Sequence, residues 1–240
     1  MKSNPTEFGK LFLIPTTLGL TEPLEVLPLT IKRTIEQIDH FIVENEKTAR
    51  RFIKKITPRK TQSLLQIFLL NKFTEAEALP GYLTPCLEGK PVGVLSEAGC
   101  PAIADPGAMI VKLAHEKGIQ VVPMVGPSSI ILALMASGLN GQNFAFNGYL
   151  PIDSGERKKA IKQLEKRSRE LGQTQLFMET PYRNDKLVQE LLKTLHGKTR
   201  LCIAADITLK TEWIRTHEAS QWMGKLPELN KRPAIFAIQA

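Results

Sequence analysis

The sequence predicts an α/β fold in which two α/β domains are each built around mostly parallel β-sheets. Short apolar runs alternate with segments of helical pattern along all 240 residues, and this alternation is typical of βαβ units. The hydrophobic share of 42% and the charged share of 23% are those of a globular protein. A proline stands at each end of the segment Pro123–Pro127, with Gly126 between them. We therefore expect an N-terminal domain at 1–123 and a C-terminal domain at 124–240.

The first series of elements opens with an apolar run that Pro15 ends. Thr74 is expected to cap a helix, because Glu77 follows three residues later and completes a capping box. Gly118 is expected to end the last helix of the series as its C-cap. In order, we expect a strand at Leu11–Ile14, a helix at Leu24–Ile38, a strand at Phe41–Val43, a helix at Glu46–Ile56, a strand or a helix at Leu64–Leu70, a helix at Thr74–Leu87, a strand at Val92–Leu95, a helix at Ala108–Lys117 and a strand at Ile119–Val122.

The second series repeats the alternation with helices of similar length. Strands of four to six residues that are separated by helices of about 10–15 residues favour parallel pairing through crossovers. In order, we expect a helix at Ser128–Ser137, a strand at Phe144–Tyr149, a helix at Glu156–Leu171, a strand at Leu176–Glu179, a helix at Asp185–Leu195, a strand at Leu201–Ala205 and a strand at Ala234–Ile238.

Three turns that follow predicted strands are the candidate ligand-binding segments, because ligands of parallel sheets collect at the carboxyl ends of strands. Taken alone, Pro15–Gly19 fits an ordinary turn between a strand and a helix. The long loop Ser96–Gly107 is rich in small residues and held by two prolines, which favours a binding loop. In Val125–Ser129, the serine hydroxyls fit either a helix N-cap or contacts to a polar ligand.

Composition and missing motifs exclude several classes of protein. Lys and Arg number 32 against 24 for Asp and Glu, so the net charge is +8 and favours a polyanionic partner such as nucleic acid. The sequence contains no HExxH, GxSxG, GxxxxGK[ST] or GxGxxG motif, and its three cysteines form no CxxC pair. We expect no metal site, no disulfide framework and a reducing compartment. The opening MKSNPTEFGK has no apolar secretory core, and no uninterrupted membrane helix is expected.

Two basic windows are the candidate RNA-binding segments. Residues 47–60 contain seven basic side chains and no acidic one, and residues 157–169 contain seven basic side chains against Glu165. Clustered positive charge can follow a phosphate backbone, although such runs are commonly solvated helix faces. The residues that we expect to contact RNA are Lys47, Arg50, Arg51, Lys54, Arg157, Lys158, Lys159 and Arg183.

Seven strings that occur in order along the chain resemble a known family. They are LFLIPTTLGL, VENEKTAR, LSEAGCPAIADPG, VVPMVGPSSIILALMASGL, GYLPIDSGERKKA, FMETPYR and ITLKTEW. Together these strings resemble the tetrapyrrole-methylase superfamily, and within it the ribosomal RNA small-subunit methyltransferase I family, which 2′-O-methylates a cytidine.

The resemblance implies a two-domain fold with its active site in the cleft between the domains, and S-adenosylmethionine as the methyl donor. It also implies a cytoplasmic homodimer that acts on ribosomal RNA or the small ribosomal subunit. The residues that match the donor site are Pro15, Ser96, Glu97, Ile103, Ser128, Ser129 and Met178.

The chain departs from the family pattern at several positions. Leu20 stands where the family has Asn after Gly, and Asn45 and Lys47 replace an Asp and an Arg. Glu97 replaces a shorter Asp, and Tyr182 replaces a His. These changes fall in the expected substrate site, so they bear on the acceptor more than on methyl transfer itself.

A ribose hydroxyl is a weak nucleophile, so a base that accepts its proton would accelerate the reaction. Glu44 and Glu179 are the candidates, because each follows a predicted buried strand. Each could instead be a solvated carboxylate or an ion-pair partner of Arg183. Two other functions remain open: methylation of a tetrapyrrole such as a precorrin, and RNA binding without catalysis, which the changes at Leu20 and Asn45 would permit.

Overall fold

The computed structural model describes residues 7–240 and divides the chain into two compact units. Unit 1 ends at Pro127 and unit 2 is Ser128–Ala240, so the division falls a few residues after the expected boundary. The first six residues of the opening segment, for which we expect no secretory signal, lie outside the described residues. Among residues 7–240, no helix is long and apolar enough to cross a lipid bilayer.

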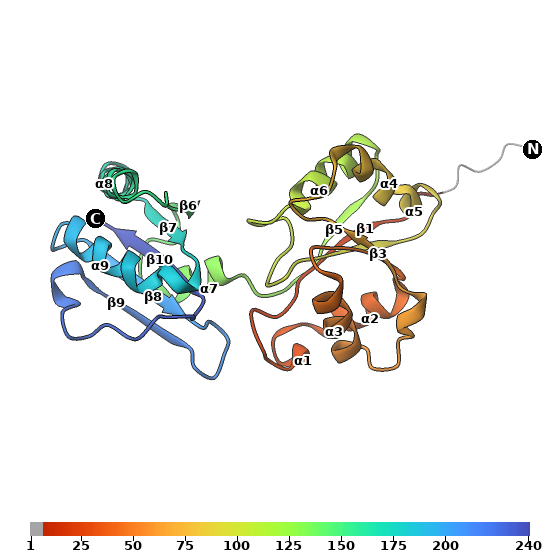
Figure 1. Ribbon diagram of the computed structural model, residues 1–240, viewed down its shortest axis with the longest axis horizontal. Helices are drawn as coiled ribbons and strands as arrows, with labels where there is room; N and C mark the ends of the chain where they lie inside the picture. The colour runs from red at the N-terminus through yellow and green to blue at the C-terminus, as the bar shows by residue number, and fades with distance from the viewer. Residues whose placement is uncertain (1–6) are drawn as a thin grey trace, which may run out of the picture. The chain divides into compact units, whose positions relative to one another are not determined.

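Unit 1 is built around five parallel strands in the order β3-β2-β4-β1-β5 (Figure 1). Because β4 returns between β2 and β1, the chain changes direction across the sheet, as in doubly wound folds. The strands are β1 (Leu11–Ile14), β2 (His40–Val43), β3 (Gln66–Leu69), β4 (Val92–Leu95) and β5 (Val121–Pro123), and the helices are α1 (Pro23–Val26), α2 (Leu29–Gln37), α3 (Glu46–Ile56), α4 (Leu79–Tyr82), α5 (Thr84–Leu87) and α6 (Gly107–Glu116).

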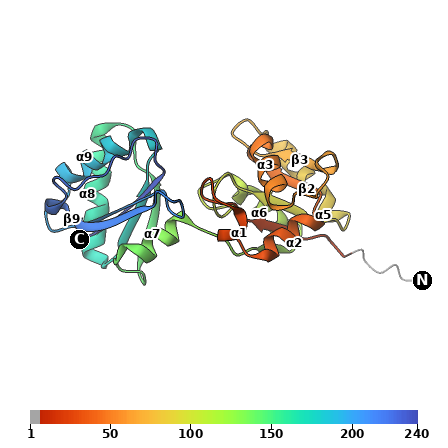
Figure 2. The ribbon, with the colours of Figure 1, turned by 90° about the horizontal axis from the view of Figure 1, so that it is seen from below.

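Helices cover both faces of this sheet, so successive strand residues enter different cores. Ile31 of α2 and Ile53 of α3 share one apolar cluster with Phe41 of β2. Ile110 of α6 belongs to a second cluster with Ile42, the next residue of β2. Figure 2 shows α1, α2 and α3 along the side of unit 1 that faces the viewer. This three-layer arrangement leaves the carboxyl edge of the sheet to loops.

Prolines account for two expectations in unit 1 that are wrong. The single helix expected at 24–38 is two helices, because Pro28 precedes α2 in an extended conformation. The helix expected at 74–87 is a 3₁₀ turn (Ala76–Ala78) followed by α4 and α5, each of which has a proline in its first turn. Thr74 caps no helix, since its hydroxyl donates to the Leu69 carbonyl. The ambiguous segment 64–70 contains the strand β3.

Unit 2 contains a second sheet with the strand order β6-β7-β10-β8-β9. Apolar residues of α8 and α9 form one core with alternate residues of β8 and β10, and the intervening residues Cys202, Ala204 and Ile235 are also buried. On β9, the Thr216 hydroxyl donates to the Ser137 carbonyl at the end of α7, at 2.7 Å. The elements are α7 (Ser129–Ser137), β6 (Phe144–Tyr149), α8 (Ser154–Leu171), β7 (Thr174–Met178), α9 (Asn184–Thr194), β8 (Arg200–Ala205), β9 (Trp213–Glu218) and β10 (Ala234–Gln239).

The pairing in this sheet differs from the parallel pattern that we expect. Only β6 and β7 are parallel, whereas β7 with β10, β10 with β8 and β8 with β9 are antiparallel. No crossover helix separates β8 from β9, so a short connection returns the chain antiparallel there. Strand β10 then lies between β7 and β8 and runs antiparallel to both. Strand β9 was not predicted, because its charged residues Arg215 and Glu218 interrupt the apolar pattern.

Candidate functional site

The turns that follow β1 and β4 are bonded together at the carboxyl edge of unit 1. The Thr16 amide donates to the Gly99 carbonyl at 3.0 Å, and the Thr16 hydroxyl donates to the Ser96 carbonyl at 3.3 Å. The Ser96 hydroxyl donates to the Gly99 carbonyl at 2.7 Å. Pro15 and Ser96, two expected donor-site residues, therefore lie on neighbouring turns of one edge.

The loop after β4 has an unusual backbone. Gly99, Ala102 and Ala104 have φ angles of 75°, 66° and 60°, which is a region that alanine rarely adopts. The Asp105 carboxylate holds the loop by accepting the amide protons of Ala102 and Gly107, each at 2.8 Å. Backbone strain of this kind concentrates at functional sites. Ile103 lies between the two strained alanines, with 53% of its surface exposed.

The segment after β5 packs tightly against the turn after β1. A Cβ atom on Gly126 would lie 2.2 Å from Pro15 Cβ and 2.6 Å from Pro15 Cγ, so only glycine fits here. The Cys100 thiol lies 3.4 Å from the Pro127 carbonyl, which ties the β4 loop to the same segment. Three segments far apart in the sequence thus meet within unit 1, as the carboxyl ends of parallel strands should.

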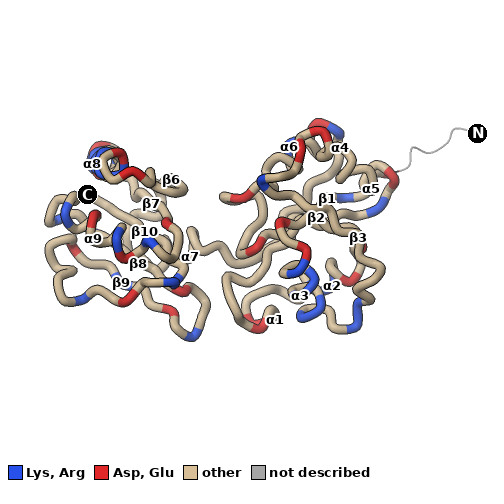
Figure 3. The backbone as a smooth tube through the Cα atoms, viewed as in Figure 1, with Lys and Arg blue, Asp and Glu red and all other residues tan. Residues whose placement is uncertain are grey.

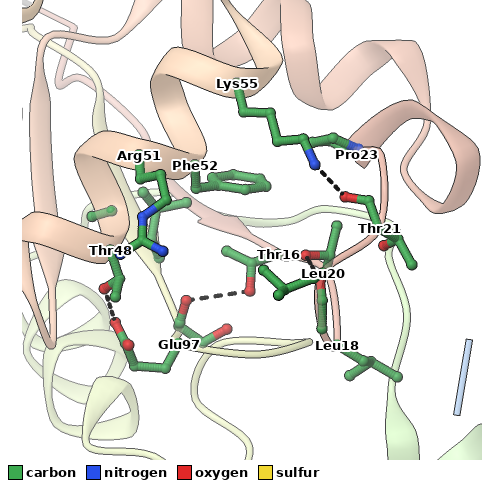
Figure 4. Close-up of a pocket in the computed structure, with 15 residues that line it drawn as sticks. Thr16, Leu18, Leu20, Thr21, Pro23, Thr48, Arg51, Phe52, Lys55 and Glu97 are labelled. Atoms are coloured by element: carbon green, nitrogen blue, oxygen red, sulfur yellow. Dashed lines mark hydrogen bonds between the residues drawn. The ribbon is translucent and has the colours of Figure 1, made fainter. Parts of the chain in front are cut away.

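A pocket of about 230 Å³ opens beside these turns, between them and α3 (Figure 4). The turn after β1 forms one wall, α3 forms another, and Glu97 closes one end. The Thr48 hydroxyl donates to Glu97 Oε1 at 2.6 Å across this end. The lining residues are Thr16, Thr17, Leu18, Gly19, Leu20, Thr21, Pro23, Thr48, Ala49, Arg51, Phe52, Lys55, Leu95, Ser96 and Glu97.

Three carboxyl groups gather at this edge of the sheet. Glu44 follows β2 and lines a small cavity together with Asp105. Burial raises the pKa of Glu44 above its usual value, and the charge of Asp105 adds to the effect, while a hydrogen bond from the Glu97 backbone opposes it. Burial also raises the pKa of Asp105. A carboxylate with a raised pKa is a better proton acceptor than a solvated one.

The remaining donor-site residues belong to unit 2. Ser128 is the N-cap of α7, and its hydroxyl oxygen accepts from the Ile131 amide at 3.4 Å. Ser129 is the first residue of that helix and Met178 is the last residue of β7. Ser128 therefore has the helix-capping role, which is one of the two roles that the sequence left open for these serines.

Glu179 directly follows β7 and is buried, with an exposed fraction of 4%. Its Oε1 accepts from two nitrogen atoms of Arg183, at 3.0 and 2.7 Å, and from the Thr180 amide. Its Oε2 is buried without a hydrogen-bond partner. Glu179 is thus an ion-pair partner of Arg183, as one of the sequence alternatives had it.

Some of the candidate RNA contacts on α3 are already hydrogen-bonded within the chain, and others are not. Arg50 donates to Glu46 at 2.7 Å and to the Gln62 carbonyl at 2.6 Å, and Lys54 donates to the Pro58 carbonyl at 2.8 Å. Among residues 7–240, the side chains of Lys47 and Arg51 have no hydrogen-bond or ion-pair partner. Figure 3 shows the positive charge along α3. Lys47 and Arg51 are therefore the groups on this helix that are available to a phosphate.

On α8, the expected RNA contact at Arg157 needs correction. The residue is 2% exposed, and its guanidinium pairs with Glu190 and donates to the carbonyls of Pro151 and Ile152. Its charge is used within unit 2. Lys158 and Lys159 are exposed on the same helix, and Lys159 pairs with Glu156 at 2.9 Å.

Sequence reasoning did not single out several residues of this edge. Thr48 and Phe52 lie one turn apart on α3 and face the pocket, and this i, i+4 spacing was the available signal. The role of Asp105 could not be predicted, because the sequence does not specify the backbone conformation of the loop that contains it. Asn45, one of the departures from the family pattern, caps α3 by accepting the amide protons of Lys47 and Thr48.

Comparisons with known proteins agree with the resemblance. Residues 23–221 match the family described as Tetrapyrrole (Corrin/Porphyrin) Methylases. Ribosomal RNA small subunit methyltransferase I of Vibrio cholerae serotype O1 is 29% identical over 215 residues, which cover 89% of this chain and 70% of that protein. The protein of the same name from Escherichia coli O157:H7 is 30% identical over 218 residues, which cover 88% and 69%.

The fold also matches a solved structure. Uroporphyrin-III C-methyltransferase from Thermus thermophilus, solved in complex with S-adenosylhomocysteine, aligns with a TM-score of 0.56 at 15% identity. The alignment covers 96% of this chain and 97% of that one. The likeness confirms the α/β fold class that the sequence predicts.

Proposed function

Because the chain belongs to the tetrapyrrole methylase family, and within it to the ribosomal RNA small subunit methyltransferase I family, we propose that it methylates a ribose 2′-hydroxyl of small-subunit ribosomal RNA. The chain is an S-adenosylmethionine-dependent methyltransferase. The observation that carries the proposed acceptor is the similarity to relatives of that name over 88% and 89% of the chain.

The residues of unit 1 fit a methyl donor of this kind. Gly126 permits a close approach between the segments after β5 and β1 that a side chain would block. Pro15, Ser96, Glu97 and Ile103 lie on these carboxyl-edge turns, where we propose that they contact the donor. Ser128, Ser129 and Met178 are the proposed contacts from unit 2. When bound, the donor supplies a methyl group on a positively charged sulfur, for which nearby carboxylates are favourable partners.

Glu44 is the proposed general base of the transfer. The acceptor hydroxyl gives its proton to the Glu44 carboxylate while its oxygen forms a bond to the methyl carbon and the carbon–sulfur bond breaks. The raised pKa of Glu44 suits this role, because it brings proton affinity closer to working pH. Glu179 is a weaker candidate, since its Oε1 already accepts two hydrogen bonds from Arg183.

We predict that Glu44→Gln lowers the single-turnover rate of methyl transfer by about 10²–10⁴-fold. In the unsubstituted protein, the rate should rise with pH through a pKa above the ordinary value of 4.5, because only the carboxylate accepts a proton. The Glu44→Gln protein should lack this rise. Quenched-flow measurement from pH 4.5 to 8 checks both statements.

The matched control is Glu179→Gln, which should be tested at the same pH values. A neutral residue at position 44 should not destabilise the fold at neutral pH, because a raised carboxyl pKa means that the charged form costs folding free energy there. A lost rate would then not reflect unfolding. Equal rates for Glu44→Gln and the unsubstituted protein would refute the role of Glu44.

RNA binding should depend on salt. For contacts to single-stranded RNA, the slope of log affinity against log salt falls by about 0.7 for each phosphate contact. We expect Lys47→Gln and Lys158→Gln each to reduce the slope by about that amount. Lys112→Gln on α6 is the control, because Lys112 is exposed but lies outside the two basic windows. Its Nζ lies 3.8 Å from Glu116 Oε1. An affinity that does not change between 50 and 200 mM salt would contradict these contacts.

The proposed acceptor is tested with tritiated S-adenosylmethionine and small ribosomal subunits from a strain that lacks this protein. We expect label in the RNA, at one ribose. Transfer to a tetrapyrrole with none to RNA would refute the acceptor. We further propose that the protein acts in the cytoplasm as a homodimer, which size-exclusion chromatography with light scattering tests.

A further inference from the structure

The pocket beside α3 has the composition of a nucleotide site. Phe52 is half-buried, and its ring projects into the pocket in Figure 4. Leu18 and Leu20 line the opposite wall from the turn after β1. Leu20 is 94% exposed, so its side chain has almost no packing within the chain. Flat apolar ligands stack on such surfaces, and base stacking on aromatic rings is common in RNA recognition.

Positive charge lies at the mouth of this pocket. Helix α3 has the sequence EKTARRFIKKI, with five basic residues and one acidic residue. Arg51 precedes Phe52 and lines the pocket, and its guanidinium has no partner among the described residues. Lys55 is one turn further along but is engaged by Glu22 at 3.0 Å and the Thr21 carbonyl at 2.9 Å. Of the two cations that line the pocket, Arg51 is thus the one without a partner among residues 7–240.

We propose that this pocket binds one unstacked nucleotide of the RNA substrate, with its base against Phe52 and Leu20 and its phosphate at Arg51. The pocket, with a volume of about 230 Å³, is far too small for a duplex. The proposal rests on the proposed function, and it names the part of unit 1 that holds the acceptor strand. The Glu97–Thr48 hydrogen bond closes the polar end of the same pocket.

The position of the pocket relative to the carboxylates supports this assignment. Ser96 and Glu97, which are also proposed donor contacts, line the pocket at the end of β4, so the donor and the nucleotide would meet there. Leu95 lines both this pocket and the small cavity that contains Glu44. The pocket and the cavity of the proposed base thus share one lining residue, although Glu44 itself does not line the pocket.

The test uses the full chain and a fluorescently labelled single-stranded RNA decamer, with binding followed by anisotropy. We expect Phe52→Leu to weaken binding by about 5- to 50-fold, because leucine keeps apolar volume but cannot stack as a ring does. Phe52→Tyr keeps the ring and should stay within twofold. Arg51→Gln should weaken binding and reduce the salt slope by about 0.7.

Matched controls separate the pocket from general effects. Phe73→Leu changes a phenylalanine of unit 1 that is 77% exposed and does not line the pocket, and it should leave RNA affinity unchanged. Calorimetric titration with S-adenosylhomocysteine should give the same affinity for all of these variants. Thermal unfolding checks that each variant is folded. If Phe52→Leu does not fold, the surface variant Arg51→Gln still tests the proposal.

Three results would overturn the proposal. The first is a decamer affinity within twofold of the unsubstituted protein for both Phe52→Leu and Arg51→Gln, and the second is an equal loss of decamer affinity for Phe52→Leu and Phe52→Tyr. The third is a loss of S-adenosylhomocysteine affinity in these variants while their RNA affinity is kept. The last would assign the pocket to the donor. A failure of the proposed function gives a different result: decamer binding would depend on Phe52, but no methyl group would be transferred to ribosomal RNA.

Discussion

Gly126→Ala is expected to lower kcat/KM for methyl transfer by about 100-fold and to lower Tm by about 4–8 °C. The added Cβ would lie 2.2 Å from Pro15 Cβ, far inside contact distance, and a proline ring cannot rotate away. The turn after β1 must therefore move, at an overpacking cost of about 1–3 kcal/mol. Because the turns after β1 and β4 are bonded through Thr16, the displacement reaches Ser96 as well.

Gly81→Ala is the matched control, because no atom lies within 4 Å of the Cβ that it would add. It should leave both activity and Tm nearly unchanged. Steady-state kinetics and differential scanning calorimetry of the two variants make the comparison. If Gly126→Ala kept the activity of the unsubstituted protein, the packing of Gly126 on Pro15 would have no part in the site.

The layers of the fold were accessible from the sequence, because hydrophobic periodicity determines which residues can be buried. The run Glu46–Ile56 has Ala49, Ile53 and Ile56 at helical spacing, and α3 has those bounds. Hydrophobic periodicity gave wrong elements where other features of the chain outweighed it. The capping box of Thr74 and Glu77 was outweighed by the prolines at 80 and 85, and strand β9 gains its place from pairing with β8, which no local pattern encodes.

The site was predicted less completely than the fold. Its turns could be placed, because strand ends are visible in the sequence and parallel strands bring their carboxyl ends together. The contacts could not be placed, since they depend on side chains from distant segments. The Thr48–Glu97 hydrogen bond joins residues 49 positions apart. Arg157 was misassigned for the same reason, because its partner Glu190 lies on another helix.

Arg157→Met is expected to lower the free energy of unfolding by about 3 kcal/mol, because it leaves the Glu190 carboxylate in a largely buried position without its partner. The Glu190 side chain is 20% exposed and that of Arg157 is 3% exposed. Arg157 Nη2 donates to Glu190 Oε1 at 2.6 Å, and the two side chains make a second bond through Arg157 Nε and Glu190 Oε2. The pairing raises the pKa of Arg157 and lowers that of Glu190, so both groups stay charged at neutral pH. Urea denaturation at pH 7 measures the loss.

The double variant Arg157→Met/Glu190→Leu distinguishes a buried charge from lost packing. Removing both charges should restore at least half of the stability, because the unpaired carboxylate is gone and apolar side chains fill the space. Lys158→Gln on the exposed face of α8 should stay within about 0.5 kcal/mol of the unsubstituted protein, while weakening RNA binding. If Arg157→Met were equally stable but bound RNA more weakly, then Arg157 would contact RNA after all and its pairing with Glu190 would be incidental. The neighbouring positions 157 and 158 therefore separate the two uses of positive charge on this helix, one within the core of unit 2 and one at its surface.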